Sequence, residues 1–495
     1  MSHSSIDTKS GYQTAFKATA LFGGVQAITI IVSILKSKVV AIWLGATGFG
    51  IMSLFNATTS LIFSITNLGL QSSAVRDIAK EKGAKNYIGV SQIIKAINRW
   101  LLATGLCGAI IMIVLSPWLS QWLFDSNQYI SAFILLSCVV FLTGIYNGNY
   151  AVLQGMRKLS LMAKANVVGS ISGFICSAPL YYFFRENGIV WAMILTALST
   201  TIISFFFVKK VKLVPVNQTC QESFKLGLKT VKLGIMMAIS SIAVLLVQFI
   251  VKTFIVKLGG LNDVGYYQAG WALNATYLGM VFTAMGKDYF PRLSQTAHDN
   301  RETSLKINEQ AEIAILILAP FIIAMIVFMP FLIKLLYSEK FLVIIPMTKW
   351  LLIGSLVKAG SWGLSFVFLA KGDGKTFLFN ELGIKLITIP TYLLGYYVFG
   401  LVGIGYAYLF GYAVYFVWIA IIAFRKYKLH YKKRFWMTFF ILFTLIIIFP
   451  LGEHLWDASY FTGIILILVI SAFSLVILNK RVGLIQLFRS FVKKK

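Results

Sequence analysis

Residues 101–116 read LLATGLCGAIIMIVLS, an apolar stretch without a charged side chain. They belong to a candidate span near 96–116, and about 20 such residues suffice for a helix to cross the hydrocarbon core of a membrane. Similar stretches recur along the whole chain. We identify fourteen, near 15–35, 50–70, 96–116, 129–150, 163–184, 188–208, 233–256, 266–286, 311–333, 344–370, 376–398, 401–424, 435–451 and 460–479.

The composition agrees with a membrane protein. Of 495 residues, 58% are apolar and 13% are charged, whereas soluble domains have about 45–50% and about 25%. The sequence therefore predicts an all-α integral membrane protein and excludes soluble enzymes, DNA-binding domains and secreted disulfide scaffolds. The net charge of +28 does not indicate a nucleic-acid partner, because topology accounts for most of it.

The distribution of Lys and Arg predicts the orientation. An even number of spans places both termini on one side, and cytoplasmic loops carry an excess of basic residues. With both termini in the cytoplasm, the outer loops hold few of the 45 basic residues, namely Lys36, Lys38, Arg185, Lys257, Lys334 and Lys340. The basic inner face would also attract anionic membrane lipids. We expect a multi-pass membrane protein with both termini in the cytoplasm and without a cleavable signal peptide.

Short glycine-containing motifs recur about 215 residues apart, which indicates an internal duplication. Leu44–Gly50 corresponds to 258–265, 153–158 to 369–375, and 188–192 to 403–407. Six spans separate the copies, so both copies have the same orientation, as in a parallel repeat. The predicted organisation is an N-terminal six-helix bundle at 1–208, a cytoplasmic linker at 209–232, a second bundle at 233–424, and a two-helix hairpin with a basic tail at 425–495. Two such bundles suit an alternating-access transporter.

Charged side chains inside predicted spans are the candidate binding groups. Such residues are costly in lipid and normally face a cavity or a partner. Lys252, Lys358 and Lys385 lie deep within spans, while Lys17 and Lys349 lie nearer the interfaces, and Glu381 is the one acid away from a span end. An excess of ammonium groups over carboxylates predicts a cationic cavity for an anionic cargo. Glu381 either forms a local ion pair with Lys385, four residues away, or couples transport to an ion.

A second polar group is expected at the cytoplasmic mouth. Arg76 and Asp77 follow the second span, and Asp288 and Arg292 follow the eighth. They form either a gate or ordinary helix-end charges. No histidine lies in a span, no Walker A pattern occurs, and no large outer loop offers acidic groups for glycosyl transfer. We therefore expect no metal site, no cofactor and no enzymatic activity.

Several motifs resemble the Wzx-type polysaccharide flippases of the multidrug/oligosaccharidyl-lipid/polysaccharide (MOP) exporter superfamily. The resemblance covers about residues 11–425 and includes the surroundings of Lys358 and Glu381. The motifs are 36–38, 44–50, 264–269, 290–294, 336–341, 356–360 and 370–372. The hairpin at 435–479 departs from twelve-span members and is similar to the fourteen-span ones, which include lipid II flippases.

The resemblance implies a V-shaped pair of six-helix bundles that flips an oligosaccharide linked to undecaprenyl diphosphate toward the periplasm, for O-antigen or a related surface polysaccharide. It also implies work alongside a polysaccharide polymerase and its chain-length machinery. The alternatives are a lipid II-type peptidoglycan precursor flippase and a cation-coupled multidrug exporter. Five membrane lysines against one acid disfavour a cationic drug as cargo.

Overall fold

The computed structural model describes residues 28–455 and 460–482, and in this part of the chain it contains helices and no strand. Ten helical stretches among these residues are long and apolar enough to cross a membrane. Leu159–Val208, Ala238–Gln295 and Gly374–Tyr427 are each long enough for two successive spans. The first predicted span lies mostly outside the described residues, which begin within a helix at 28–43. The predicted all-α membrane class is confirmed.

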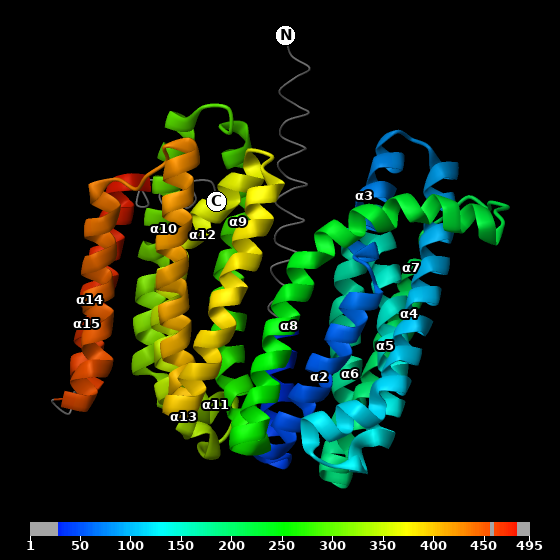
Figure 1. Ribbon diagram of the computed structural model, residues 1–495, viewed down its shortest axis with the longest axis horizontal. Coiled ribbons are helices and arrows are strands. Elements are labelled where there is room, and N and C mark those ends of the chain that lie inside the picture. Colours follow the sequence, from blue (N-terminus) through cyan, green and yellow to red (C-terminus); the bar gives the residue numbers. More distant parts are fainter. Residues whose placement is uncertain (1–27, 456–459, 483–495) are drawn as a thin grey trace, which may run out of the picture. The chain divides into compact units, whose positions relative to one another are not determined.

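The chain forms two compact units, Met1–Gly265 and Tyr266–Lys495 (Figure 1). The first unit holds helix 28–43, α2 (Gly45–Thr66), α3 (Leu70–Gly83), α4 (Tyr87–Phe124), η1 (Asn127–Tyr129), α5 (Ile130–Gly155), α6 (Leu159–Phe184), η2 (Arg185–Asn187), α7 (Gly188–Val208) and most of α8 (Cys220–Leu273). The second holds the end of α8, η3 (Asn274–Leu278), α9 (Gly279–Gln295), α10 (Asn300–Val327), α11 (Met329–Leu336), η4 (Glu339–Ile344), α12 (Ile345–Ala370), α13 (Gly374–Tyr427), α14 (Lys433–Leu455) and α15 (Tyr460–Val482).

The boundary between the units lies within α8 rather than in the expected linker at 209–232. Gly260, with φ of 78°, breaks α8 into two helical segments. The segment before this break is the seventh predicted span, and it packs in the first unit although the repeat assigns it to the second copy. The division into sequence repeats stays a prediction that is separate from these compact units.

The backbone itself carries the internal repeat. Positive φ angles occur at Gly45 (67°) and Gly260 (78°), at Arg157 (48°) and Gly372 (72°), and at Arg185 (51°) and Gly400 (58°). The members of each pair are about 215 residues apart, the offset of the sequence motifs. Left-handed backbone is costly for residues other than glycine, so its recurrence at matching positions indicates that both copies turn in the same way. The parallel repeat is thus visible without any similarity of side chains.

One hydrogen bond between two chain segments also recurs in both copies, but the lysine that donates it comes from a different segment in each copy. In the first unit, Nζ of Lys82 donates to the carbonyl of Met156 at 2.5 Å. In the second unit, Nζ of Lys371 donates to the carbonyl of Ala297 at 2.5 Å. Met156 and Lys371 are repeat equivalents, as are Lys82 and Ala297. Both copies therefore tie the same two loops together, but the lysine stands on opposite loops.

Helix α8 is held against α2 by contacts between residues that are equivalent in the repeat. Oγ1 of Thr47 donates to Oδ1 of Asn262 at 2.7 Å, and these residues are 215 positions apart. Beside them, a Cβ atom on Gly50 would lie 2.1 Å from the carbonyl oxygen of Leu261, and one on Gly265 would lie 2.0 Å from that of Ala46. Any side chain at Gly50 or Gly265 would force the two backbones apart.

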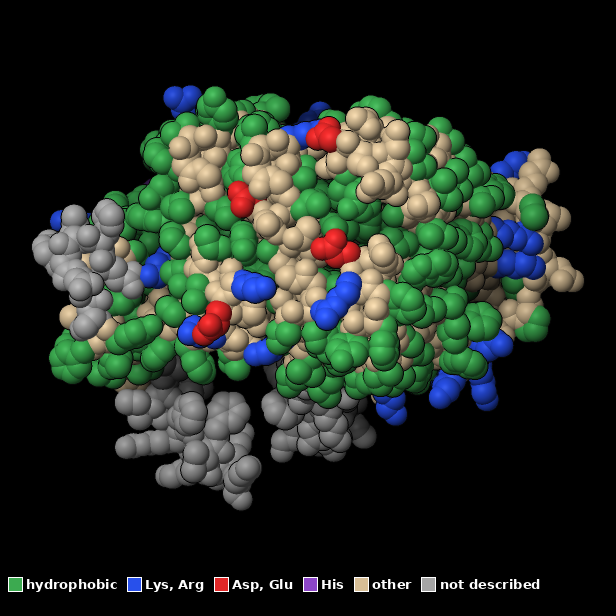
Figure 2. All heavy atoms as spheres, turned by 90° about the horizontal axis from the view of Figure 1, so that it is seen from below, with side chains coloured by type: hydrophobic (Ala, Val, Ile, Leu, Met, Phe, Trp, Pro, Cys, Tyr) green, Lys and Arg blue, Asp and Glu red, His purple; other side chains and the backbone are tan. Residues whose placement is uncertain are grey.

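Charges at the predicted outer loops are paired within each unit. Lys257 lies 2.5 Å from Asp125 in the first unit, and Lys334 lies 2.8 Å from Glu339 in the second. Figure 2 shows a face on which acidic and basic side chains are interspersed among apolar ones. This pairing agrees with the weak net charge expected for outer loops, while the orientation in the membrane stays a prediction.

The C-terminal hairpin is an integral part of the second unit. The carboxylate of Glu312 on α10 is 12% exposed and contacts Arg434 of α14 at 3.3 Å and Arg481 of α15 at 3.2 Å. The Tyr431 hydroxyl donates to the carbonyl of Gly360 at 2.5 Å. One carboxylate thus anchors both helices of the hairpin to α10.

The loop between α12 and α13 is held by Asp373. Its carboxylate accepts hydrogen bonds from Lys426, from the Tyr427 hydroxyl at 2.7 Å and from the backbone of Thr376 at 3.3 Å. Desolvation raises the pKa of Asp373, but the hydrogen bonds from Lys426, Tyr427 and Thr376 outweigh it and hold this pKa well below its usual value. The ionised Asp373 carboxylate therefore links the start of α13 to the last residues of the same helix.

We expect Glu312→Gln to lower the free energy of unfolding by about 1.5–3 kcal/mol, the range for hydrogen bonds to charged groups, because two arginines lose their counter-ion. Thermal unfolding of the purified protein in detergent measures the effect. Glu309→Gln is the matched control, since Glu309 is 54% exposed and pairs only with Lys306 three residues away, an interaction of about 1 kcal/mol or less. Equal losses in both variants would contradict the anchoring role.

We expect Asp373→Asn to destabilise the protein at neutral pH and to have little effect at low pH. A carboxyl group whose pKa is depressed by folding stabilises the fold above its unfolded pKa, about 3.9 for Asp, and this contribution is lost as the pH falls. Unfolding of wild type and variant between pH 7 and pH 2 tests this, because the difference should begin to shrink only below about pH 3.9. A difference that stays constant over this range would show that the charge of Asp373 is not what stabilises the loop.

Candidate substrate-binding site

Two helices of the second unit bring three predicted site residues together. Lys358 lies on α12, and Glu381 and Lys385 lie one turn apart on α13, all three partly buried. Lys358 interacts electrostatically with Glu381, and Lys385 interacts with both Glu381 and Lys358. Two ammonium groups therefore share one carboxylate within this cluster, which keeps a net positive charge.

Aromatic rings surround the Lys358 ammonium group. Its Nζ lies 5.1 Å from the ring centre of Phe282 and 5.5 Å from that of Tyr412. Tyr412 and Lys358 also interact electrostatically. On the carboxylate side, the Tyr415 hydroxyl donates to Oε1 of Glu381 at 3.5 Å. Ring faces stabilise a cation without neutralising it, so Lys358 is held in place while its charge stays available.

A buried polar network continues from these tyrosines toward α8 and η3. The Ser355 hydroxyl donates to Oδ1 of Asn274 at 2.8 Å and lies 3.2 Å from the Tyr408 hydroxyl. Tyr408 and Tyr412 are one turn apart, with ring centres 4.7 Å from each other. Asn274 opens a π-helical turn, a feature often found at functional sites. These contacts hold Tyr408 and Tyr412 in place beside the charged cluster.

Sequence reasoning missed Asn274, Tyr408, Tyr412 and Tyr415. The signal was present in the spacing, because Tyr408, Tyr412 and Tyr415 recur at helical intervals on one face of the last span of the repeat. Tyrosine is common in membrane helices, however, and only packing shows that this face meets Lys358 and Glu381.

Lys252 lies in the other unit. It is 5% exposed on α8, and among the described residues no acidic side chain forms an ion pair with it. The structure does not relate its position to the cluster on α12 and α13. Its burial agrees with the prediction that it is a functional cation, and its contact with a substrate stays a prediction.

The structure does not bring Lys349 into the cluster. Lys349 and Lys358 are nine residues apart on α12, which places them on opposite faces of the helix. The Nζ of Lys349 lies 5.9 Å from the ring of Phe449 on α14, so Lys349 faces the C-terminal hairpin. Lys17 lies outside the described residues.

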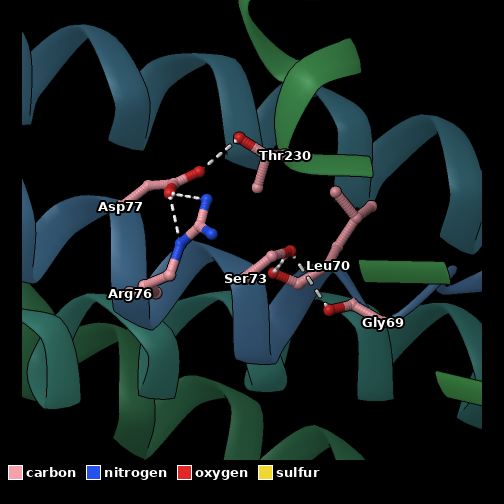
Figure 3. A network of polar contacts seen from close by, with 6 residues as sticks. All are labelled: Gly69, Leu70, Ser73, Arg76, Asp77 and Thr230. Carbon is pink, nitrogen blue, oxygen red and sulfur yellow. Dashed lines mark hydrogen bonds and ion pairs between the residues drawn. The ribbon is translucent and has the colours of Figure 1, made fainter. Parts of the chain in front are cut away.

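The residues predicted for a cytoplasmic gate are each paired within their own unit. Arg76 contacts its neighbour Asp77 at 2.6 Å, and the Thr230 hydroxyl of α8 donates to the other oxygen of Asp77 at 2.8 Å (Figure 3). In the second unit, Arg292 lies 2.6 Å from Asp288, one turn away. A gate formed by these groups stays a prediction.

Near the contact of Asp77 with α8, the backbones of the two segments also approach each other closely. A Cβ atom on Gly69 would lie 2.0 Å from the carbonyl oxygen of Gly234. Gly69, at the start of α3, therefore allows the closest approach of the two chain segments at this end of α8. The described residues contain no group of three or more His, Cys, Asp or Glu side chains that could hold a metal ion.

Comparison with known proteins places the chain in a family. The model of a family described as "Polysaccharide biosynthesis protein" matches residues 39–346. The lipid III flippase of Escherichia coli (strain K12) is 20% identical over 406 residues, which cover 81% of this chain and 96% of that protein.

Solved structures agree on the fold. The lipid II flippase MurJ, in an inward closed conformation, superposes with a TM-score of 0.70 at 13% identity, and the match covers 94% of this chain and 99% of that one. An inward-facing MATE family multidrug transporter of the MOP superfamily gives a TM-score of 0.62 at 18% identity, covering 80% of this chain and 94% of that one. These relatives are flippases and transporters, which confirms the prediction that the chain is not an enzyme. The chain belongs to the polysaccharide biosynthesis protein family, and its fold is that of the MOP superfamily of membrane transporters.

Proposed function

We propose that this protein flips polyprenyl-diphosphate-linked oligosaccharide repeat units, for O-antigen or a related surface polysaccharide, from the cytoplasmic to the periplasmic leaflet of the bacterial inner membrane. The observation that carries the proposal is the cluster of Lys358 and Lys385 around the single carboxylate of Glu381. A diphosphate is a compact anion, and lysines bind phosphate as mobile point charges. The lipid III flippase, which resembles most of the chain, supports a lipid-linked cargo.

In the proposed mechanism, the diphosphate binds at Lys358 and Lys385 while the lipid tail stays in the bilayer. Lys252 is a further proposed contact from the first unit. Movement of the repeated bundles then exposes the headgroup to the other side. The inner orientation of both termini, and work alongside a polysaccharide polymerase and its chain-length machinery, are part of the same proposal.

The overlap with the lipid II flippase MurJ includes nearly all of this chain, so a peptidoglycan precursor is the second candidate cargo. Both candidates present a diphosphate to the same lysines. Competition between the two purified lipids for the protein in liposomes distinguishes them, because the physiological cargo should displace the other. A cation-coupled drug exporter would need surplus carboxylates, whereas this cluster has surplus ammonium groups.

We expect Lys358→Gln to reduce flipping of a fluorescent lipid-linked diphosphate sugar by at least about tenfold in liposomes, because the headgroup loses a desolvated cation. Lys349→Gln is the matched control, since it removes a charge from the opposite face of the same helix. Both variants must reach the membrane at wild-type levels. Full transport by Lys358→Gln would rule out the proposed headgroup site.

We expect Glu381→Gln to tighten the binding of inorganic pyrophosphate by at least about fivefold, since even a carboxylate screened as strongly as in bulk water costs about 1 kcal/mol beside an anion. Lys385→Gln should weaken binding. Isothermal titration of the purified variants measures both effects. If Glu381→Gln weakened pyrophosphate binding, the carboxylate would have to organise the site rather than oppose its ligand.

A further inference from the structure

A groove of about 400 Å³ lies along α9 and α12 in the second unit, within the size range of small-molecule sites. Its walls are mainly aromatic. The lining residues are Phe282, Thr283, Gly286, Phe290, Trp362 and Phe366. Apart from Phe282, which contacts the Lys358 ammonium group, these residues have no part in the headgroup cluster or in the proposed transport mechanism, so the groove needs its own explanation.

The groove begins at the charged cluster. On α12, Lys358, Trp362 and Phe366 follow one another at intervals of four residues, so they form one row along the helix. Phe282, which lines the groove, is also the ring 5.1 Å from the Lys358 ammonium group. With a rise of about 1.5 Å per residue, the row extends about 12 Å from the cation. A ligand bound to Lys358 can therefore continue directly into the groove.

Helix α9 repeats the same spacing, and its rings pack against those of α12, so both helices line the groove together. Ring centres of Phe282 and Trp362 are 5.7 Å apart, and those of Phe290 and Phe366 are 5.9 Å apart. Between these two pairs lies Gly286, where a Cβ atom would lie 3.3 Å from the Trp362 ring. The absence of a side chain at Gly286 therefore lets the Trp362 ring pack directly against α9 in the middle of the groove.

The lining favours a hydrocarbon over a sugar. Thr283 and the Trp362 indole carry the polar side-chain atoms of the groove, and the Thr283 hydroxyl already donates to the carbonyl of Gly279 at 2.8 Å. A sugar ring would leave most of its hydroxyl groups without partners there, at a cost of about 1–3 kcal/mol for each buried group. An isoprene chain has no such groups and gains from burial against the rings.

We propose that this groove binds the first isoprene units of the lipid carrier, with their diphosphate at Lys358. The inference rests on the proposed function, because it takes the ligand to be a prenyl diphosphate. A cation at one end and an apolar channel behind it match an amphiphile with an anionic head. The groove would then recognise the carrier lipid rather than the glycan, whatever sugars it bears.

The test is a chain-length series with the full-length protein in detergent. Inorganic pyrophosphate and isopentenyl, geranyl and farnesyl diphosphates are titrated against wild type and variants. We expect wild-type affinity to rise by at least about tenfold from isopentenyl to farnesyl diphosphate. Gly286→Leu forces a side chain against the Trp362 ring and so changes the lining of the groove; it should reduce this rise to about twofold, with unchanged affinity for pyrophosphate. Partition into detergent is the same for every variant, so the difference between variants reports the groove.

Two further variants protect the test. Phe290→Ala removes a ring that is 37% exposed and should also reduce the rise, even if Gly286→Leu fails to fold. Met280→Ala is the matched control, because Met280 is an apolar residue of α9 that is 40% exposed and does not line the groove, so the whole series should stay unchanged.

Three outcomes would overturn the proposal. An unchanged chain-length rise in Gly286→Leu and Phe290→Ala, with normal pyrophosphate binding, would reject the groove and leave the headgroup site intact. Weaker binding of a sugar diphosphate without a prenyl chain in the same variants would assign the groove to the glycan. Failure of wild type to bind pyrophosphate or any prenyl diphosphate would instead reject the proposed function, and the groove proposal with it.

Discussion

An ammonium group cannot lie against lipid tails without a large loss of hydration, and this constraint governs the second unit. Lys358 meets it through the rings of Phe282 and Tyr412 and through the nearby carboxylate of Glu381. None of these contacts removes the positive charge of the cluster, because Lys385 shares the same carboxylate. The helices are therefore packed around a charge that is stable in the fold and still able to attract an anion.

The duplication is preserved in the backbone more faithfully than in the side chains. Paired positive φ angles mark the same turns in both copies, and the loop contact made by Lys82 in one copy is made by Lys371 from the opposite loop in the other. The site, by contrast, has diverged, since the residues of the first copy equivalent to Lys358 and Glu381 are Thr143 and Asn166, which carry no charge. A shared framework with one specialised copy allows chemistry to change without altering the turns that set helix directions.

Much of the fold followed from composition and spacing. Apolar stretches of sufficient length predict membrane helices because hydrocarbon demands that backbone groups bond within the segment. Glycines at positions 45 and 260 mark equivalent turns, because both adopt positive φ angles that other residues rarely adopt. The burial of Lys252 and Lys358 was predicted because both lie inside apolar spans. A charge in such a span is costly in lipid and therefore indicates a cavity or a partner. Lys349 differs, because helical position alone does not say which neighbour a face will meet, and its neighbour is Phe449 of the hairpin.

What the chain alone determined is the all-helical membrane class, the duplication and the excess of cations within spans, since hydropathy, charge and repeat spacing are properties of linear sequence. Tertiary structure decided which of these cations share a carboxylate, that α8 packs across the repeat boundary against α2, and that Tyr408, Tyr412 and Tyr415 face the charged cluster. Such contacts join residues far apart in sequence, and they depend on how helices rotate and cross, which no local pattern specifies.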